Sequence, residues 1–195
     1  MILGVILARG GSKRIPRKNL RMLGGIPLLA WTILAAKQCQ SLDGLVVSSE
    51  DDDILAAARD WGVPVIERPA EMASDDASSY PPLIHAVDAA TGMYRDVCLL
   101  QPTSPFRLPY DIDLCCMAQD KRVRPATVAC QHGRGVPNGA VYVGEVEWLR
   151  DGGNFDDADM TVKHFMPEDR SLDIDTEADW QQAEKIVAES VFASL

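Results

Sequence analysis

Residues 1–19 read MILGVILARGGSKRIPRKN, and this stretch indicates the fold and the kind of ligand together. Its apolar run, 1–8, is typical of a strand buried on both faces of a parallel sheet. Gly10 and Gly11 follow among five cations, and glycines let backbone N–H groups approach a ligand closely. Since Arg and Lys bind phosphate oxygens, we expect this loop to bind a phosphorylated ligand. A solvated basic surface loop is the alternative.

The charge of the whole chain limits which classes of ligand the loop can bind. The net charge is -10 and the isoelectric point is about 4.7, so the basic loop is a local exception. A nucleic acid would be repelled by most of such a surface, which favours a small phosphorylated molecule. Neither the Walker A spacing nor G-x-G-x-x-G occurs, so two common phosphate motifs are excluded.

Length and cysteine content describe the expected class of protein. A chain of 195 residues with 47% hydrophobic residues predicts one domain over 1–195. Five cysteines without C-x-x-C spacing argue against a disulfide framework and a zinc site, and indicate reduced thiols in the cytoplasm. No segment has the length of a membrane span, so we expect a soluble protein without a membrane partner.

Apolar runs alternate with amphipathic stretches along the chain, which predicts an α/β fold with a mostly parallel sheet. Strands are expected at 1–7, 45–48, 63–66, 96–100, 126–130 and 140–143. Helices are expected at 27–40, 51–61, 80–90, 110–121 and 176–193. The prolines of QPTSP (101–105) predict a loop after a strand, on the edge where open α/β sheets bind ligands.

Three polar features have more than one interpretation. Asp173 and Asp175 would point to the same side of an extended segment and suit Mg²⁺, although Asp175 could instead cap the last helix. Arg68 could donate to a base carbonyl and ring nitrogen, or form a surface ion pair with a neighbouring glutamate. Asn138 and the glycine after it are first of all a turn signal.

Five motifs in one order carry a resemblance to a known family. They are ARGGSKRIPRKN (8–19), RPAEMASD (68–75), LQPTSPFR (100–107), NGAVY (138–142) and SLDIDTEADW (171–180). Together they resemble the CMP-sialic acid synthetases, the acylneuraminate cytidylyltransferases. The resemblance implies a Rossmann-like, three-layer nucleotidyltransferase that joins CTP to a sialic-acid-like 2-keto-3-deoxy sugar acid, releases pyrophosphate and requires Mg²⁺.

The resemblance also implies a role for each matching residue. Lys18, Arg9 and Asp175 would be catalytic, and Asp173 and Asp175 would hold the metal. Gln101, Thr103, Ser104 and Asn138 would face the sugar acid. The nucleotide would be bound by Ala8, Arg9, Gly10, Gly11, Ser12, Lys18, Asn19, Arg68 and Ser74.

One region departs from the family pattern. The chain is shorter than its relatives before Asn138, and Gly135 stands where a tyrosine is expected. Relatives carry sugar-binding residues and a dimerisation element there, so we expect a reduced lobe at about 122–138. Loss of this element predicts a monomer, and the family's homodimer is the alternative. Lys121, Arg122, Arg124 and Arg134 are the remaining candidates for binding the acceptor carboxylate. The alternatives for function are a nucleotidyltransferase for Kdo or another smaller acceptor, and a catalytically weak nucleotide-binding protein.

Overall fold

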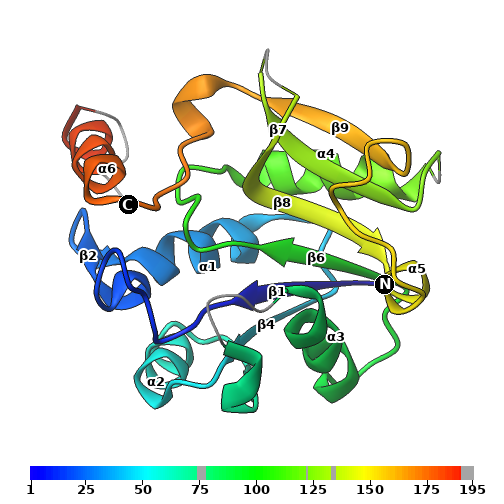
Figure 1. Cartoon of the computed structure of the whole chain (residues 1–195), viewed down its shortest axis with the longest axis horizontal. Coiled ribbons are helices and arrows are strands. Elements are labelled where there is room, and N and C mark those ends of the chain that lie inside the picture. Colours follow the sequence, from blue (N-terminus) through cyan, green and yellow to red (C-terminus); the bar gives the residue numbers. More distant parts are fainter. Residues whose placement is uncertain (74–77, 122, 133–134, 190–195) are drawn as a thin grey trace.

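A seven-stranded sheet forms the centre of the computed structural model, which describes residues 1–73, 78–121, 123–132 and 135–189 (Figure 1). In spatial order the strands are β5 (Val65–Glu67), β4 (Gly44–Ser49), β1 (Ile2–Leu7), β6 (Asp96–Leu100), β8 (Pro137–Glu145), β7 (Ala126–Gln131) and β9 (Thr161–Met166). The strands β5, β4, β1 and β6 are parallel, β8 is antiparallel to both of its neighbours, and β9 runs parallel to β7. The prediction of a mostly parallel α/β sheet is confirmed.

Helices cover both faces of this sheet and produce the predicted three layers. Helices α1 (Leu28–Gln38), α2 (Asp52–Asp60) and α4 (Pro109–Asp120) pack on one face through side chains such as Ile33, Ile54 and Ile112. Helices α3 (Tyr80–Ala89) and α5 (Val146–Arg150) pack on the other, where Leu83 and Leu149 are buried. The expected helices agree with the observed ones within about two residues, except that 190–193 lie outside the described residues.

Several observed elements were not predicted from the sequence. Strand β9, helix α5, the hairpin β2 (Met22–Leu23) and β3 (Ile26–Pro27), and the 3-10 helices η1 (Lys18–Leu20), η2 (Ala70–Ala73) and η3 (Glu168–Arg170) are all additions. Strand β8 also starts earlier than predicted. Asn138 and Gly139 therefore lie within a strand, at a shift of the β7–β8 register, and not in a turn between elements.

A third apolar cluster lies at one end of the molecule, where helix α6 (Glu177–Glu189) packs beside the β2–β3 hairpin (Figure 1). Ile15 of the basic loop, Ile174 and Trp180 are buried together in it. The start of α6 is capped reciprocally: Asp179 accepts from the Thr176 N–H at 2.7 Å, and the Thr176 hydroxyl accepts from the Asp179 N–H at 3.3 Å. The interpretation of Asp175 as the cap is therefore wrong, and its carboxylate is available for the site.

Candidate nucleotide-binding and catalytic site

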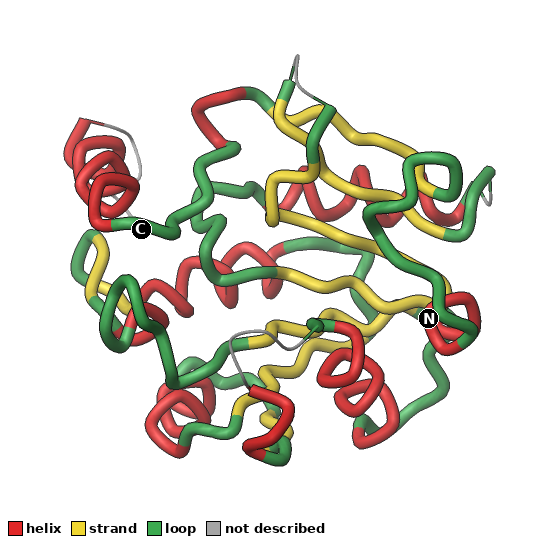
Figure 2. Tube along the Cα trace, viewed as in Figure 1, coloured by secondary structure: helices red, strands yellow, loops and turns green. Residues whose placement is uncertain are grey.

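Loops leave the carboxyl ends of β1 and β6 at one edge of the sheet (Figure 2). This is the edge at which open α/β sheets bind ligands. A cavity of about 370 Å³ is lined by residues of these loops. The residues expected at the site that line the cavity are Arg9, Ser12, Lys18, Asn19, Arg68, Gln101, Thr103, Asp173 and Asp175. The structure thus gathers side chains from both ends of the chain around one space.

The basic loop between β1 and η1 is held by acidic residues at the start of α2. The Gly10 N–H donates to Glu50 at 2.8 Å, and a side chain at position 10 would collide with Asp51. Arg17 has a left-handed backbone (φ 54°) and pairs with Asp51 at 2.8 Å and with Asp53 at 2.5 Å. These ion pairs therefore use Arg17 to fix the conformation of the loop. In the sequence it was one of the five cations expected to bind phosphate.

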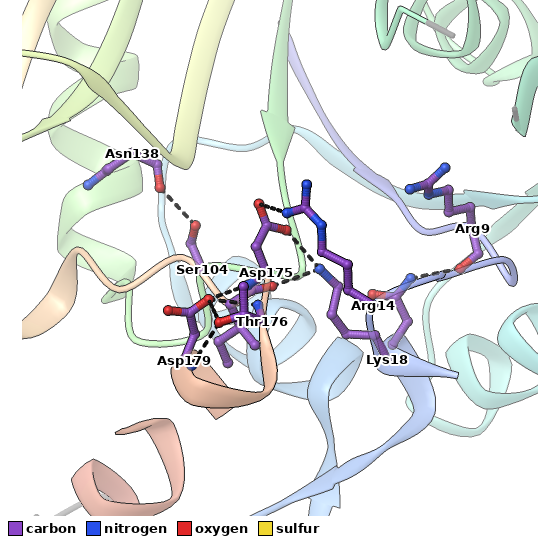
Figure 3. Close-up of polar contacts among 10 residues, drawn as sticks. Arg9, Arg14, Lys18, Ser104, Asn138, Asp175, Thr176 and Asp179 are labelled. Atoms are coloured by element: carbon purple, nitrogen blue, oxygen red, sulfur yellow. Dashed lines mark hydrogen bonds and ion pairs between the residues drawn. The ribbon is translucent and has the colours of Figure 1, made fainter. Parts of the chain in front are cut away.

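Lys18 connects the loop to the segment that carries the paired aspartates. Its ammonium donates to the Ile174 carbonyl at 2.7 Å and to Asp175 Oδ1 at 3.1 Å, and Arg14 approaches Asp175 Oδ2 at 3.7 Å. Figure 3 shows Lys18 and Arg14 both directed toward Asp175. A cation and a carboxylate predicted for catalysis, 157 residues apart along the chain, are thus in direct contact.

Asp173 and Asp175 offer carboxylate oxygens to the same cavity. Burial raises the pKa of Asp173, with Asp175 adding repulsion, while a hydrogen bond from Thr103 and the charge of Lys18 oppose the rise. Its Oδ1 is buried without a hydrogen-bond partner among the described residues. An unpaired buried carboxylate oxygen beside a second carboxylate is a donor set that suits a hard divalent cation.

The two aspartates would not hold such a cation alone. Among residues 1–73, 78–121, 123–132 and 135–189, no group of three or more His, Cys, Asp or Glu side chains is placed to bind a metal ion. Mg²⁺ commonly keeps several waters and takes one or two carboxylates together with substrate phosphates. The arrangement therefore fits a cation that arrives with a phosphorylated substrate.

Arg68 lies at the carboxyl end of β5 and is almost fully buried, with 4% of its side chain exposed. The alternative interpretation, a surface ion pair with a neighbouring glutamate, is wrong. Arg68 is buried and pairs instead with Glu50, which follows β4. Nε and Nη2 of Arg68 donate to Glu50 Oε2 at 3.1 and 2.8 Å. Sequence reasoning missed Glu50 because nothing near position 50 resembles a ligand motif.

The loop after β6 divides the residues expected to face the sugar acid. Gln101 and Thr103 line the cavity, whereas Ser104 is buried and donates to the Asn138 carbonyl at 3.0 Å (Figure 3). The Asn138 amide donates to the Ser171 hydroxyl at 3.1 Å, and its Oδ1 accepts from the Ala140 N–H at 3.1 Å. Ser104 and Asn138 therefore lie behind the cavity wall, where they fix its shape.

A buried arginine that the sequence did not single out supports the same loop. Arg107 donates to the Thr32 hydroxyl at 2.6 Å and to the Gln101 carbonyl, and burial lowers its pKa to about 10. The signal that could have found it is an arginine directly after a proline-stiffened ligand loop.

The other expected site residues take different places. Ala8 is buried at the end of β1 and Gly11 is exposed, so the loop backbone remains their only means of binding. Neither Lys121 nor Arg124 lines the cavity. Ser74, Arg122 and Arg134 lie outside the described residues. Among the described residues, no helix is long and apolar enough to cross a membrane.

Curated relatives match a little more than half of the chain. An N-acylneuraminate cytidylyltransferase of Escherichia coli is 42% identical over 106 residues, which are 54% of this chain and 25% of that protein. A CMP-N,N'-diacetyllegionaminic acid synthase of Legionella pneumophila is 42% identical over 118 residues, 57% of this chain and 50% of the relative. The chain thus spans a quarter to half the length of these relatives.

A solved structure shares the whole fold. A CMP:2-keto-3-deoxy-manno-octonic acid synthetase complexed with CTP superposes with a TM-score of 0.80 at 16% identity, covering 96% of this chain and 98% of its own. The sequence model of the cytidylyltransferases matches residues 3–127, from the buried first strand through the basic loop and the loop after β6. The chain belongs to the cytidylyltransferase family, and its relatives agree with the resemblance to CMP-sialic acid synthetases.

Proposed function

We propose that this protein transfers CMP from CTP to the anomeric hydroxyl of a sialic-acid-like 2-keto-3-deoxy sugar acid. The observation that carries the proposal is the cavity in which Lys18, Asp173 and Asp175 meet beside Arg68. Relatives named for N-acylneuraminate, diacetyllegionaminic acid and pseudaminic acid support a nine-carbon acceptor. A cation and a carboxylate pair that suits a divalent metal supply the charge stabilisation that nucleotidyl transfer requires, and Arg68 would bind the base.

The reaction is a displacement at the α-phosphorus of CTP. The acceptor hydroxyl oxygen forms the new O–P bond, the α–β phosphoanhydride bond breaks, pyrophosphate leaves, and the hydroxyl proton passes to water or to a carboxylate of the cavity. Lys18 would stabilise the charge that grows on the phosphate oxygens, and the loop N–H groups would orient the triphosphate. Mg²⁺ held by Asp173 and Asp175, when bound, would neutralise phosphate charge.

A Kdo-type acceptor is the second candidate. The structural neighbour that acts on 2-keto-3-deoxy-manno-octonic acid matches almost from end to end, and β7 and β8 are joined here only by residues 132–136. A shorter acceptor lobe would suit a smaller sugar acid.

The decisive assay combines the protein with CTP, Mg²⁺ and a panel of sialic, legionaminic, pseudaminic and Kdo acids, and measures pyrophosphate release. We expect release with one class of acid and none without an acceptor. Addition of EDTA should stop the reaction. If the protein binds CTP but releases no pyrophosphate with any of the acids, the alternative of a catalytically weak nucleotide-binding protein is correct.

A single substitution examines the carboxylate pair. Asp175 has 56% of its side chain exposed and does not cap α6, so Asp175→Ala should fold normally. We expect turnover to be abolished while the circular dichroism spectrum is unchanged. Full activity in this variant would remove Asp175 from the site.

We also propose a cellular compartment and an oligomeric state for the enzyme. All five cysteines are free thiols, four of them buried, which supports the cytoplasm as its compartment. The short β7–β8 connection supports a monomer, which gel filtration would test against the dimer.

A further inference from the structure

Glu50 stands between the two parts of the proposed nucleotide site. The strand order β5–β4–β1 places the carboxyl end of β4 in the middle of three neighbouring strand ends. Arg68 follows β5, Gly10 lies just beyond β1, and Glu50 directly follows β4. One side chain is thus within reach of the base-facing arginine and of the phosphate loop.

Both oxygens of this carboxylate are used in that position. Oε1 accepts from the Gly10 N–H at 2.8 Å, and Oε2 accepts from Nε and Nη2 of Arg68 at 3.1 and 2.8 Å. The Arg68–Glu50 ion pair is largely buried, with 4% of the Arg68 side chain and 15% of the Glu50 side chain exposed. A buried charge that loses its partner is strongly disfavoured, so the orientation of Arg68 depends on its bonds to the Glu50 side chain.

The bonds to Glu50 decide which part of Arg68 a ligand can meet. Nη2 also approaches the Ala8 carbonyl at 3.4 Å, so Nε and Nη2 are committed to the protein. Arg68 nevertheless lines the cavity, and a ligand there meets the remaining donors around Nη1. A donor held in one place matches the adjacent acceptors O2 and N3 of cytosine. Uracil carries a hydrogen on N3 and would leave a donor unpaired.

We propose that Glu50 is a positioning residue that sets nucleotide specificity, by fixing the orientation of Arg68 and tying it to the phosphate loop. The inference rests on the proposed function, because it takes CTP as the ligand. Glu50 is not among the described residues that line the cavity. Its effect reaches the base through Arg68 and the phosphates through Gly10.

The test measures CTP and UTP binding by calorimetry in the wild-type protein and in Glu50→Gln. We expect Glu50→Gln to bind CTP about tenfold or more weakly and to lose most of the preference for CTP over UTP. Glu67→Gln is the matched control, because it makes the same chemical change at an exposed neighbour of Arg68. That control should keep both the affinity and the preference.

The possible results separate the two proposals. If wild-type protein binds CTP and Glu50→Gln retains its affinity and base preference, the inference about Glu50 is overturned alone. If the wild type binds no CTP, the proposed function fails and the inference fails with it. Should Glu50→Gln not fold, Glu50→Asp carries the same comparison: its carboxylate is too short to keep all three bonds, so a smaller loss of preference is expected, and an unchanged preference overturns the inference.

Discussion

The two halves of the sheet differ in how directly the sequence describes them. Around β5, β4 and β1, short motifs follow parallel strands and deliver Arg9, Lys18 and Arg68 to one cavity. Around β8, β7 and β9 the sheet is mixed, with β8 antiparallel and β9 parallel to β7, and the expected ligand residue Asn138 is hydrogen-bonded to its own neighbours. The family model covers the first half and ends inside β7.

This difference teaches that a donor site and an acceptor site are encoded differently. The donor loop is local, since its glycines and cations are adjacent in the chain and the strand before them fixes their position. The acceptor side depends on contacts between distant segments, such as the bond from Ser104 to the Asn138 carbonyl. The predictions below test whether the halves are separate in function as well.

The largest effect should come from the donor half. Lys18→Met removes the cation at the junction of the phosphate loop and the aspartate pair, and we expect kcat to fall by about 10²–10³-fold. Steady-state pyrophosphate release measures it. Lys185→Met, which changes an exposed lysine of α6, should leave kcat unchanged. A variant at position 18 with normal kcat would contradict the catalytic role of this lysine.

The next effect should come from the acceptor half, when a larger side chain is placed at position 139. Gly139 has φ +79°, and an added Cβ would lie 2.7 Å from Gln101 Oε1 and 2.9 Å from Ser104 Oγ. We expect Gly139→Ala to lower the free energy of unfolding by about 1–3 kcal/mol and to raise the KM for the sugar acid while CTP affinity is kept. Denaturant melts and two-substrate kinetics measure the two effects.

Gly152→Ala supplies the control for backbone strain. Gly152 has φ +92° with no atom within 4 Å of an added Cβ, so it suffers the strain without the crowding. It should lose some stability and keep the KM for the sugar acid. Equal changes in KM in both variants would show that the contacts of Gly139 do not shape the acceptor side.

The smallest effect should be a gain in stability. Burial raises the pKa of Asp173, so its charge destabilises the folded apo-protein at neutral pH. We expect Asp173→Asn to raise Tm at pH 7 by roughly 2–4 °C, corresponding to about 1 kcal/mol in a chain of this size, while activity is lost. A lower Tm measured by calorimetry would show that the carboxylate stabilises the apo-protein.

The sequence predicted the parts of the fold in which local pattern and tertiary structure agree. The strand at 96–100 has the predicted bounds, and α2, predicted at 51–61, ends just before Gly62, which has a φ of +69°. Strand β9 was missed because the residues of Thr161–Met166 alternate in exposure at a sheet edge and include Lys163 and His164. Edge strands carry such polar residues and resemble loops in sequence.

The candidate site shows the same limit at single residues. Motifs named nine of the residues that line the cavity, because each motif is contiguous. Glu50 and Arg107 escaped, since their importance lies in bonds to Gly10, Arg68 and the Gln101 carbonyl, which no spacing reveals. Asp175 was assigned two possible roles, and only the reciprocal bonds of Thr176 and Asp179 separate them.

The cluster formed by Ile15, Ile174 and Trp180 has a consequence for biosynthesis. Lys18 and Asp175 meet across 157 residues, so the ribosome has made most of the described chain before the two can touch. When β6 has just left the ribosome, the nascent chain already contains the basic loop but does not yet contain Asp173 and Asp175. The two sides of the proposed reactive centre can therefore come together only after residue 175 has been made.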